Sequence, residues 1–126
     1  MDAYDFILKH MDTVPHLEAL MLLWNSRPVG WTSEELKSRL YISEEKVKDL
    51  LRDLVRGEFV SVSSSTGAPL KYSYLSHGPE QDELMQQVDE AYRRDLVRVS
   101  TMIHAKTSPS VREFARAFLF KKEKDQ

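Results

Sequence analysis

The side chains best suited to binding a metal or moving a proton are the four histidines, His10, His16, His77 and His104. Zinc enzymes commonly draw two histidine ligands from one helix at i, i+4 spacing. No two of these histidines have that spacing, and no carboxylate stands in a metal-ligand register with them. The strings GxxxxGK[ST], GxGxxG and GxSxG, which mark phosphate-binding loops and nucleophile elbows, do not occur. The sequence therefore predicts neither an enzyme nor a metal or cofactor site.

A second chemistry is offered by the charged side chains of residues 43–56, which could contact nucleic acid. At about 100° per residue, the arc opposite the apolar stripe of this segment carries Glu45, Asp49, Arg52, Asp53 and Arg56. Carboxylates can accept from cytosine, but a phosphate-reading surface normally needs several Arg or Lys. The alternative is a solvated face whose acids and bases pair with one another. The candidate DNA-binding residues are Ser43, Glu45, Lys46, Lys48, Asp49, Arg52, Arg56 and Lys71.

Composition limits the class of protein. The 126 residues suit one compact domain with appended helices, and a hydrophobic fraction of 41% is enough for a core. The net charge of -2 argues against a protein that binds nucleic acid through bulk positive charge. The absence of cysteine excludes disulfides and zinc–thiolate sites. The longest uncharged apolar run, residues 19–24, is too short to span a bilayer, so we expect a soluble cytoplasmic protein with no membrane partner.

The first half of the chain is predicted to be helical. Residues 2–11 suit a short amphipathic helix, and apolar side chains at helical spacing predict another over residues 15–26. Thr32 and Glu35 have the spacing of a capping box, in which each side chain hydrogen-bonds the other residue's backbone N–H. That box begins a short helix over residues 33–40.

The next segment changes from helical to extended periodicity. Ser43 is a second N-cap and begins a helix that runs to residue 56. One apolar stripe follows it: Val47, Leu50, Leu51, Leu54 and Val55. Gly57 suits a C-terminal cap, and residues 59–63 and 70–75 then alternate with period two around a turn-forming loop. The sequence therefore predicts a β-hairpin after the helix.

The C-terminal part begins with a break at residues 76–79, followed by one long helical pattern from Glu80 to about residue 104. Ser108-Pro109 then suits the start of a last helix. The long stripe has too much apolar surface for a domain of about sixty residues to cover, which predicts a homodimer. The candidate dimerisation residues are Leu84, Val88, Tyr92, Leu96, Val99, Ile103, Phe114 and Phe118.

Charge is divided unevenly within this C-terminal part. Residues 92–122 hold eight Lys or Arg against two acids, whereas residues 80–90 hold five acids and no base. The basic stretch could form a second surface for nucleic acid or an acidic partner. It could also lie against the acidic stretch of a second copy, and we favour this interpretation because antiparallel pairing would align opposite charges.

The order helix, short helix, tight turn, helix, strand, loop, strand resembles the winged helix-turn-helix fold. Residues 40–62 are similar to the recognition helix and first wing strand of bacterial transcription regulators of the multiple-antibiotic-resistance (MarR) type. The matching positions are Leu40, Ser43, Val47, Leu50, Leu51, Leu54, Gly57, Phe59 and Val60. The fold class expected is mainly α with a small β-hairpin wing. We expect an N-terminal helix in residues 1–14, the winged-helix domain in residues 15–76 and a helical extension in residues 77–126.

The resemblance implies a DNA-binding transcription regulator. The third helix of its winged-helix domain, residues 43–56, would enter the major groove, and its wing would touch phosphate or the minor groove. The alternative is a winged-helix adaptor that binds another protein and does not touch DNA, because this scaffold serves both kinds of partner. The expected partners are double-stranded DNA and a second copy of the chain, or else a different protein.

Overall fold

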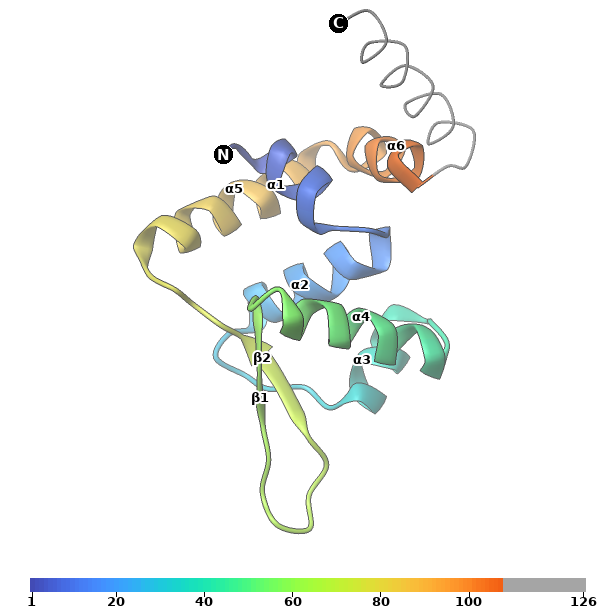
Figure 1. Ribbon diagram of the computed structural model, residues 1–126, viewed down its shortest axis with the longest axis vertical. Coiled ribbons are helices and arrows are strands. Elements are labelled where there is room, and N and C mark those ends of the chain that lie inside the picture. Colours follow the sequence, from blue (N-terminus) through green and yellow to red (C-terminus); the bar gives the residue numbers. More distant parts are fainter. Residues whose placement is uncertain (108–126) are drawn as a thin grey trace, which may run out of the picture.

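The computed structural model describes residues 1–107 and confirms the winged-helix order (Figure 1). Its elements are α1 (Ala3–His10), α2 (Val14–Ser26), α3 (Ser33–Leu40), α4 (Glu44–Arg56), β1 (Val60–Ser63), β2 (Lys71–Tyr74), α5 (Pro79–Arg94) and α6 (Leu96–Thr107). The helix expected after Pro109, with Phe114 and Phe118, lies outside the described residues.

Local capping starts the helices where the sequence predicts. The Thr13 hydroxyl accepts from the His16 backbone N–H at 3.3 Å at the start of α2. The capping box of α3 is present in full, with Glu35 N–H to Thr32 Oγ1 at 3.1 Å and Thr32 N–H to Glu35 Oε1 at 3.0 Å. Ser43 accepts from Lys46 N–H at 3.2 Å and caps α4. Each cap satisfies a backbone donor that has no partner within its helix.

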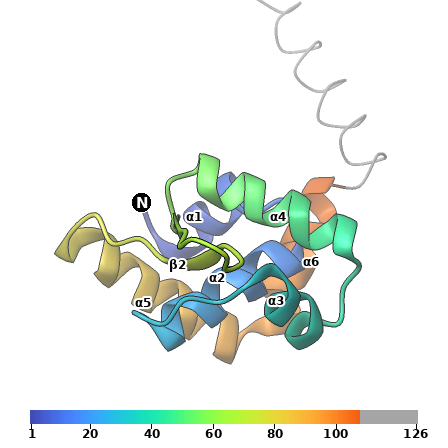
Figure 2. The ribbon, with the colours of Figure 1, turned by 90° about the horizontal axis from the view of Figure 1, so that it is seen from below.

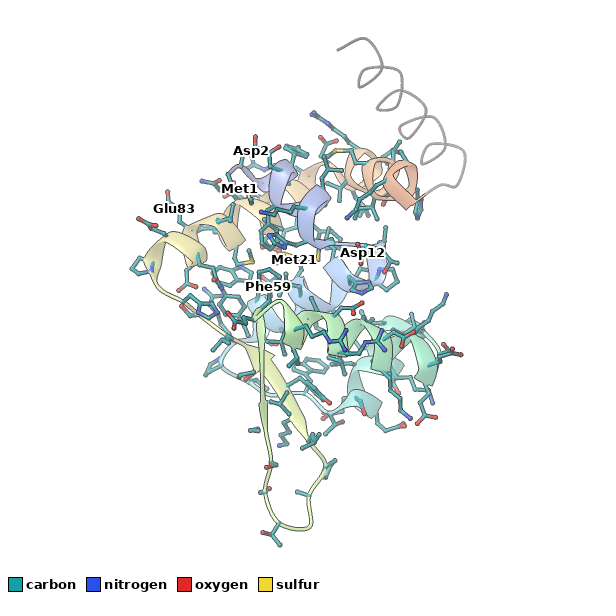
Figure 3. The ribbon with its side chains drawn as sticks, viewed as in Figure 1. Met1, Asp2, Asp12, Met21, Phe59 and Glu83 are labelled. Atoms are coloured by element: carbon teal, nitrogen blue, oxygen red, sulfur yellow. The ribbon has the colours of Figure 1, made fainter. Side chains whose placement is uncertain are left out.

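The hydrophobic core is built around α2. Leu17, Leu20 and Leu23 on this helix are fully buried, and Leu50 and Leu54 on α4 are 1% exposed. Burying one such side chain contributes about 1.5–3 kcal/mol. Figure 2 shows α2 in the middle of the molecule, between α4 and α5. In Figure 3, Met21 and Phe59 point into the interior and Glu83 points away from it.

The hairpin forms the wing. β1 and β2 pair antiparallel, with Val60 opposite Tyr74 and Val62 opposite Tyr72. Trp31 adds a short bridge to the other edge of β2 through hydrogen bonds of 2.7 and 2.8 Å with the Tyr72 backbone. The base of the hairpin is anchored where Tyr74 packs edge-on against the ring of Trp24, with ring centroids 4.9 Å apart. The other end of the hairpin projects away from the helices (Figure 1).

Gly57 ends α4 for a different reason from the one that the sequence suggests. Its φ of −73° is helical, and the left-handed residue at this turn is Glu58, with φ 63°. A Cβ at Gly57 would lie 2.6 Å from the ring of Phe59. Glycine is therefore required at this position because the Phe59 ring occupies the space, and not because of a positive φ.

The prediction of one continuous helix from Glu80 to residue 104 is wrong. The chain breaks at Asp95, and both α5 and α6 pack on α1. The Asp95 carboxylate accepts from the Tyr4 hydroxyl at 3.1 Å, and the guanidinium of Arg98 lies 4.5 Å from the centroid of the Tyr4 ring. The break turns Val99 into the core, where it is fully buried. The apolar stripe is continuous because both helices face one core.

Candidate nucleic-acid interface

The outer face of α4 is the surface that could contact nucleic acid. In Figure 1, α3, α4 and the hairpin lie below α2, whereas α1 and α6 lie above it. Since the apolar stripe of α4 is buried, the opposite side of the helix faces solvent. All the candidate DNA-binding residues are exposed: Ser43, Glu45, Lys46, Lys48, Asp49, Arg52, Arg56 and Lys71.

Acids and bases on this face pair along the helix. Lys48 Nζ lies 3.5 Å from Glu44 Oε1, and Arg52 Nη1 lies 3.3 Å from Asp49 Oδ1. Both pairs are exposed, and pairs of this kind contribute about 0.2–0.5 kcal/mol. They are weak enough for a phosphate or a partner's carboxylate to displace. Within residues 1–107, Lys46, Arg56 and Lys71 form no ion pair.

Asp53 does not belong to the outward arc in which the helical wheel placed it. Its Oδ2 lies 2.9 Å from Nε2 of His16, a buried residue of α2, and its Oδ1 lies 3.6 Å from Arg52 Nε. A carboxylate only accepts, so His16 Nε2 carries the proton and Nδ1 can accept from the Thr13 hydroxyl at 2.6 Å. This chain of hydrogen bonds ties α4 to α2. Local residue spacing could not predict this link, because His16 and Asp53 are 37 positions apart.

Sequence reasoning also missed Tyr41, in the turn between α3 and α4. Its side chain is 94% exposed, and its φ of 55° is left-handed. The Ile42 N–H continues the turn by donating to the Lys37 carbonyl at 3.4 Å. A phenol at this position, beside the first turn of α4, can donate to a phosphate oxygen. In the sequence, a large aromatic residue just before the N-cap Ser43 could have indicated this position.

The hairpin and α4 enclose an open groove of about 400 Å³. It is lined by Ser33, Lys48, Leu51, Arg52, Val55, Arg56, Val62, Leu70 and Tyr72. Val62 and Leu70 are 42% and 46% exposed, which is high for apolar side chains on a hairpin. The loop of residues 64–69 at the tip is uncharged, and Lys71 is the first base after it.

The candidate dimerisation residues within residues 1–107 differ in their exposure. Val88, Val99 and Ile103 are fully buried within the single chain, so they offer no surface to a second copy in this conformation. Leu84 and Tyr92 are half-buried. Leu96 is 45% exposed, and its neighbour Val97, which sequence reasoning did not select, is 81% exposed.

Several bases of the C-terminal part pair within their own chain. The pairs are Arg93 with Asp89 at 3.0 Å, Arg98 with Asp95 at 3.8 Å and Lys106 with Asp12 at 3.3 Å. These ion pairs therefore compensate part of the basic charge without a second copy of the chain.

The histidines have structural contacts. Besides His16, His77 Nε2 lies 2.7 Å from the Glu58 carbonyl, and His10 packs against the rings of both Phe6 and Phe59, which also contact each other. Burial is the main cause that lowers the pKa of His10, and Lys9 lowers it further. In residues 1–107, no group of three or more His, Asp or Glu is placed to hold a metal ion. No helix in that range is long and apolar enough to cross a membrane.

Comparison with known proteins gives structural matches only. No protein-family model matches the chain, and no curated protein matches it. Among solved structures it is similar to MepR, a transcription regulator of the Staphylococcus aureus multidrug efflux pump MepA, at 18% identity and a TM-score of 0.57, covering 98% of this chain and 86% of MepR.

Two further matches have the same character. The adhesin competence repressor AdcR of Streptococcus pyogenes is 17% identical with a TM-score of 0.54, covering 93% of this chain and 82% of AdcR. RV1404 of Mycobacterium tuberculosis is 18% identical with a TM-score of 0.54, covering 98% of this chain and 81% of its own. At this level of identity the likeness concerns the fold. The chain therefore has a winged helix-turn-helix fold like that of these proteins.

Proposed function

We propose that this protein is a DNA-binding transcription regulator that binds the duplex through α4 and the wing. The observation that carries the proposal is that α4 exposes Glu45, Lys48, Asp49, Arg52 and Arg56 to solvent beside a projecting hairpin (Figure 1). A major groove about 12 Å wide admits one helix of this kind. MepR and AdcR, whose fold the chain shares, are named as a transcription regulator and a repressor.

In this arrangement the first turns of α4 approach base edges. Ser43, Glu45 and Asp49 would face the bases, where a carboxylate can accept from the amino group of cytosine. Arg56 near the end of α4 and Lys71 on the wing would contact phosphates. Because α4 carries four acids and four bases, we expect weak binding to random DNA and a shallow dependence on salt.

Charge substitutions test this arrangement. Glu45→Gln combined with Asp49→Asn should tighten binding to an arbitrary duplex, because two negative charges leave the DNA-facing surface. Arg56→Ala should weaken binding and reduce the salt slope by about one unit, the loss of one phosphate contact. The measurement is fluorescence anisotropy of a labelled duplex over a salt series. Lys9→Ala, an exposed base on α1 and outside α4 and the hairpin, is the matched control. Equal behaviour of Arg56→Ala and Lys9→Ala would contradict the proposal.

We also propose that the protein acts as a homodimer, because helix-turn-helix proteins commonly bind two half-sites about one helical turn apart. Leu96 and Val97 are adjacent exposed apolar residues at the start of α6 and offer a contact to a second copy. Sedimentation should show a dimer at tens of micromolar (roughly the range where such contacts hold) and a monomer for Val97→Asp. A monomeric unmodified chain at that concentration would count against the dimer.

A second candidate function is a protein-binding adaptor. The observation in its favour is the apolar groove beside α4, together with the equal numbers of acids and bases on that helix. An adaptor would show only feeble association with DNA that salt abolishes, and the charge substitutions above would not change that association.

A further inference from the structure

The apolar face of the hairpin is covered at one end and open at the other. Val60 and Tyr74, at the base, are 2% and 8% exposed. One step along the same face, Val62 lies opposite Tyr72 and is 42% exposed, and Leu70 beyond it is 46% exposed. Together with Leu51 and Val55 of α4, these residues form what we call the helix–wing groove. Exposed apolar side chains that are grouped, and not scattered singly, are typical of interaction sites.

The polar side chains of the hairpin are directed to its other face. Ser61 and Ser73 alternate with Val62 and Tyr72 along the strands, and their hydroxyls lie 3.0 Å apart. The separation of polar from apolar faces therefore extends along both strands. It continues beyond the part of the hairpin that the core covers.

One wall of the helix–wing groove is positively charged. Lys48, Arg52 and Arg56 follow one another at intervals of four residues along α4, a line about 12 Å long. No carboxylate lines the groove within residues 1–107. Arg56 has no ion pair in that range, and the pairs of Lys48 and Arg52 are exposed and weak. An occupant that carries negative charge along one edge would therefore complete the site.

We propose that the helix–wing groove binds an amphipathic, acidic helix of a partner protein, and that this helix competes with DNA for the same surface. The apolar side of such a helix would cover Val62 and Leu70, and its acids would pair with the three bases of α4. A DNA backbone could meet the same bases, but its hydrated phosphates would leave the two apolar side chains uncovered. The apolar floor and the basic wall together therefore favour a peptide over DNA.

Only the competition rests on the proposed DNA binding, since the peptide site stands on the groove itself. The full chain is used to select from a displayed library of randomised peptides of roughly 16 residues, long enough to form a helix when bound. Enriched peptides should combine acids with apolar residues at helical spacing. The most enriched peptide is then synthesised with a fluorescent label, beside a counterpart in which each acid is replaced by lysine.

Anisotropy should show at least tenfold weaker binding of the lysine counterpart. We expect the same loss for Val62→Asp and for Arg56→Glu, both of which change exposed positions where folding should be unaffected. The control Lys9→Glu should bind the peptide as tightly as the unmodified chain. No acidic and apolar enrichment, or binding that survives both groove variants, would overturn the proposal. If the two variants weaken DNA binding while no peptide is enriched, the groove belongs to DNA and the proposal also fails. If the chain binds the peptide but enriches no DNA motif, the proposed peptide site stands and the proposed regulator function fails.

Discussion

Replacement of Asp53 by alanine tests how α4 is held against the rest of the fold. Its carboxylate accepts from Nε2 of His16 at 2.9 Å, and the histidine is 8% exposed. The substitution leaves a buried imidazole N–H without an acceptor. A hydrogen bond to a charged group contributes about 1.5–3 kcal/mol, and because the Asp53 side chain is 36% exposed, water can replace part of that loss. We therefore expect the free energy of unfolding to fall by about 1–2 kcal/mol.

The matched control is Asp49→Ala, one turn earlier on α4. Asp49 is 52% exposed and, within residues 1–107, pairs only with Arg52, so its loss should cost about 0.5 kcal/mol or less. Both substitutions bring the same gain in helix propensity, which cancels in the comparison. Urea unfolding of each variant should show a lower midpoint for Asp53→Ala with an unchanged m-value. Asp53→Asn, whose amide oxygen can still accept, should recover part of the loss. Equal midpoints for the two alanine variants would refute the link between α2 and α4.

Two other substitutions test local features of the fold. Gly57→Ala should lower the free energy of unfolding by about 1–3 kcal/mol, because its Cβ would meet the Phe59 ring at 2.6 Å. At Gly67 a Cβ would have no atom within 4 Å, so Gly67→Ala should cost only about 1 kcal/mol, for its φ of +78°. NMR should show displaced Phe59 ring resonances for the first variant alone. Burial raises the pKa of Tyr74 to about 12, and its hydroxyl donates to Asp82. The folded phenol thus keeps its proton above pH 10, whereas the unfolded phenol loses it. The free energy of unfolding should therefore fall as the pH rises past 10. Urea unfolding at pH 8 and 10.5 should show a smaller fall for Tyr74→Phe than for the unmodified chain.

The parts of the fold that sequence reasoning recovered are those decided by neighbouring residues. The Thr32–Glu35 capping box and the Ser43 cap depend on residues three positions apart, and the structure contains both. The change from helical to period-two spacing after Gly57 likewise located the hairpin. Such signals need no knowledge of the rest of the chain.

The errors concern features decided by distant contacts. Apolar periodicity indicates which side of a helix is buried, but it does not indicate whether the helix axis is continuous. It therefore could not predict the break at Asp95. Its partner Tyr4 is 91 positions away. The helical wheel placed Asp53 outward because a wheel does not contain His16. In each case a side chain from another element determines the local geometry.

The candidate site was recovered in part for the same reason. Exposure of the α4 face follows from its amphipathic spacing, and the pairing of Lys48 with Glu44 could be read from their separation of four residues. The helix–wing groove could not be predicted, because it depends on how the hairpin lies against α4. Neither α4 nor the hairpin alone indicates that Val62 and Leu70 are left uncovered.

The central claim, that α4 and the wing read a DNA sequence, is tested most directly by selection from a pool of randomised duplexes with the full chain. Affinity for one random duplex decides nothing, because weak binding is expected in either function. We expect an enriched motif with two related half-sites about one helical turn apart, and a changed base preference for Glu45→Gln. A pool that stays random with a well-folded dimer would contradict it and would favour the protein-binding adaptor.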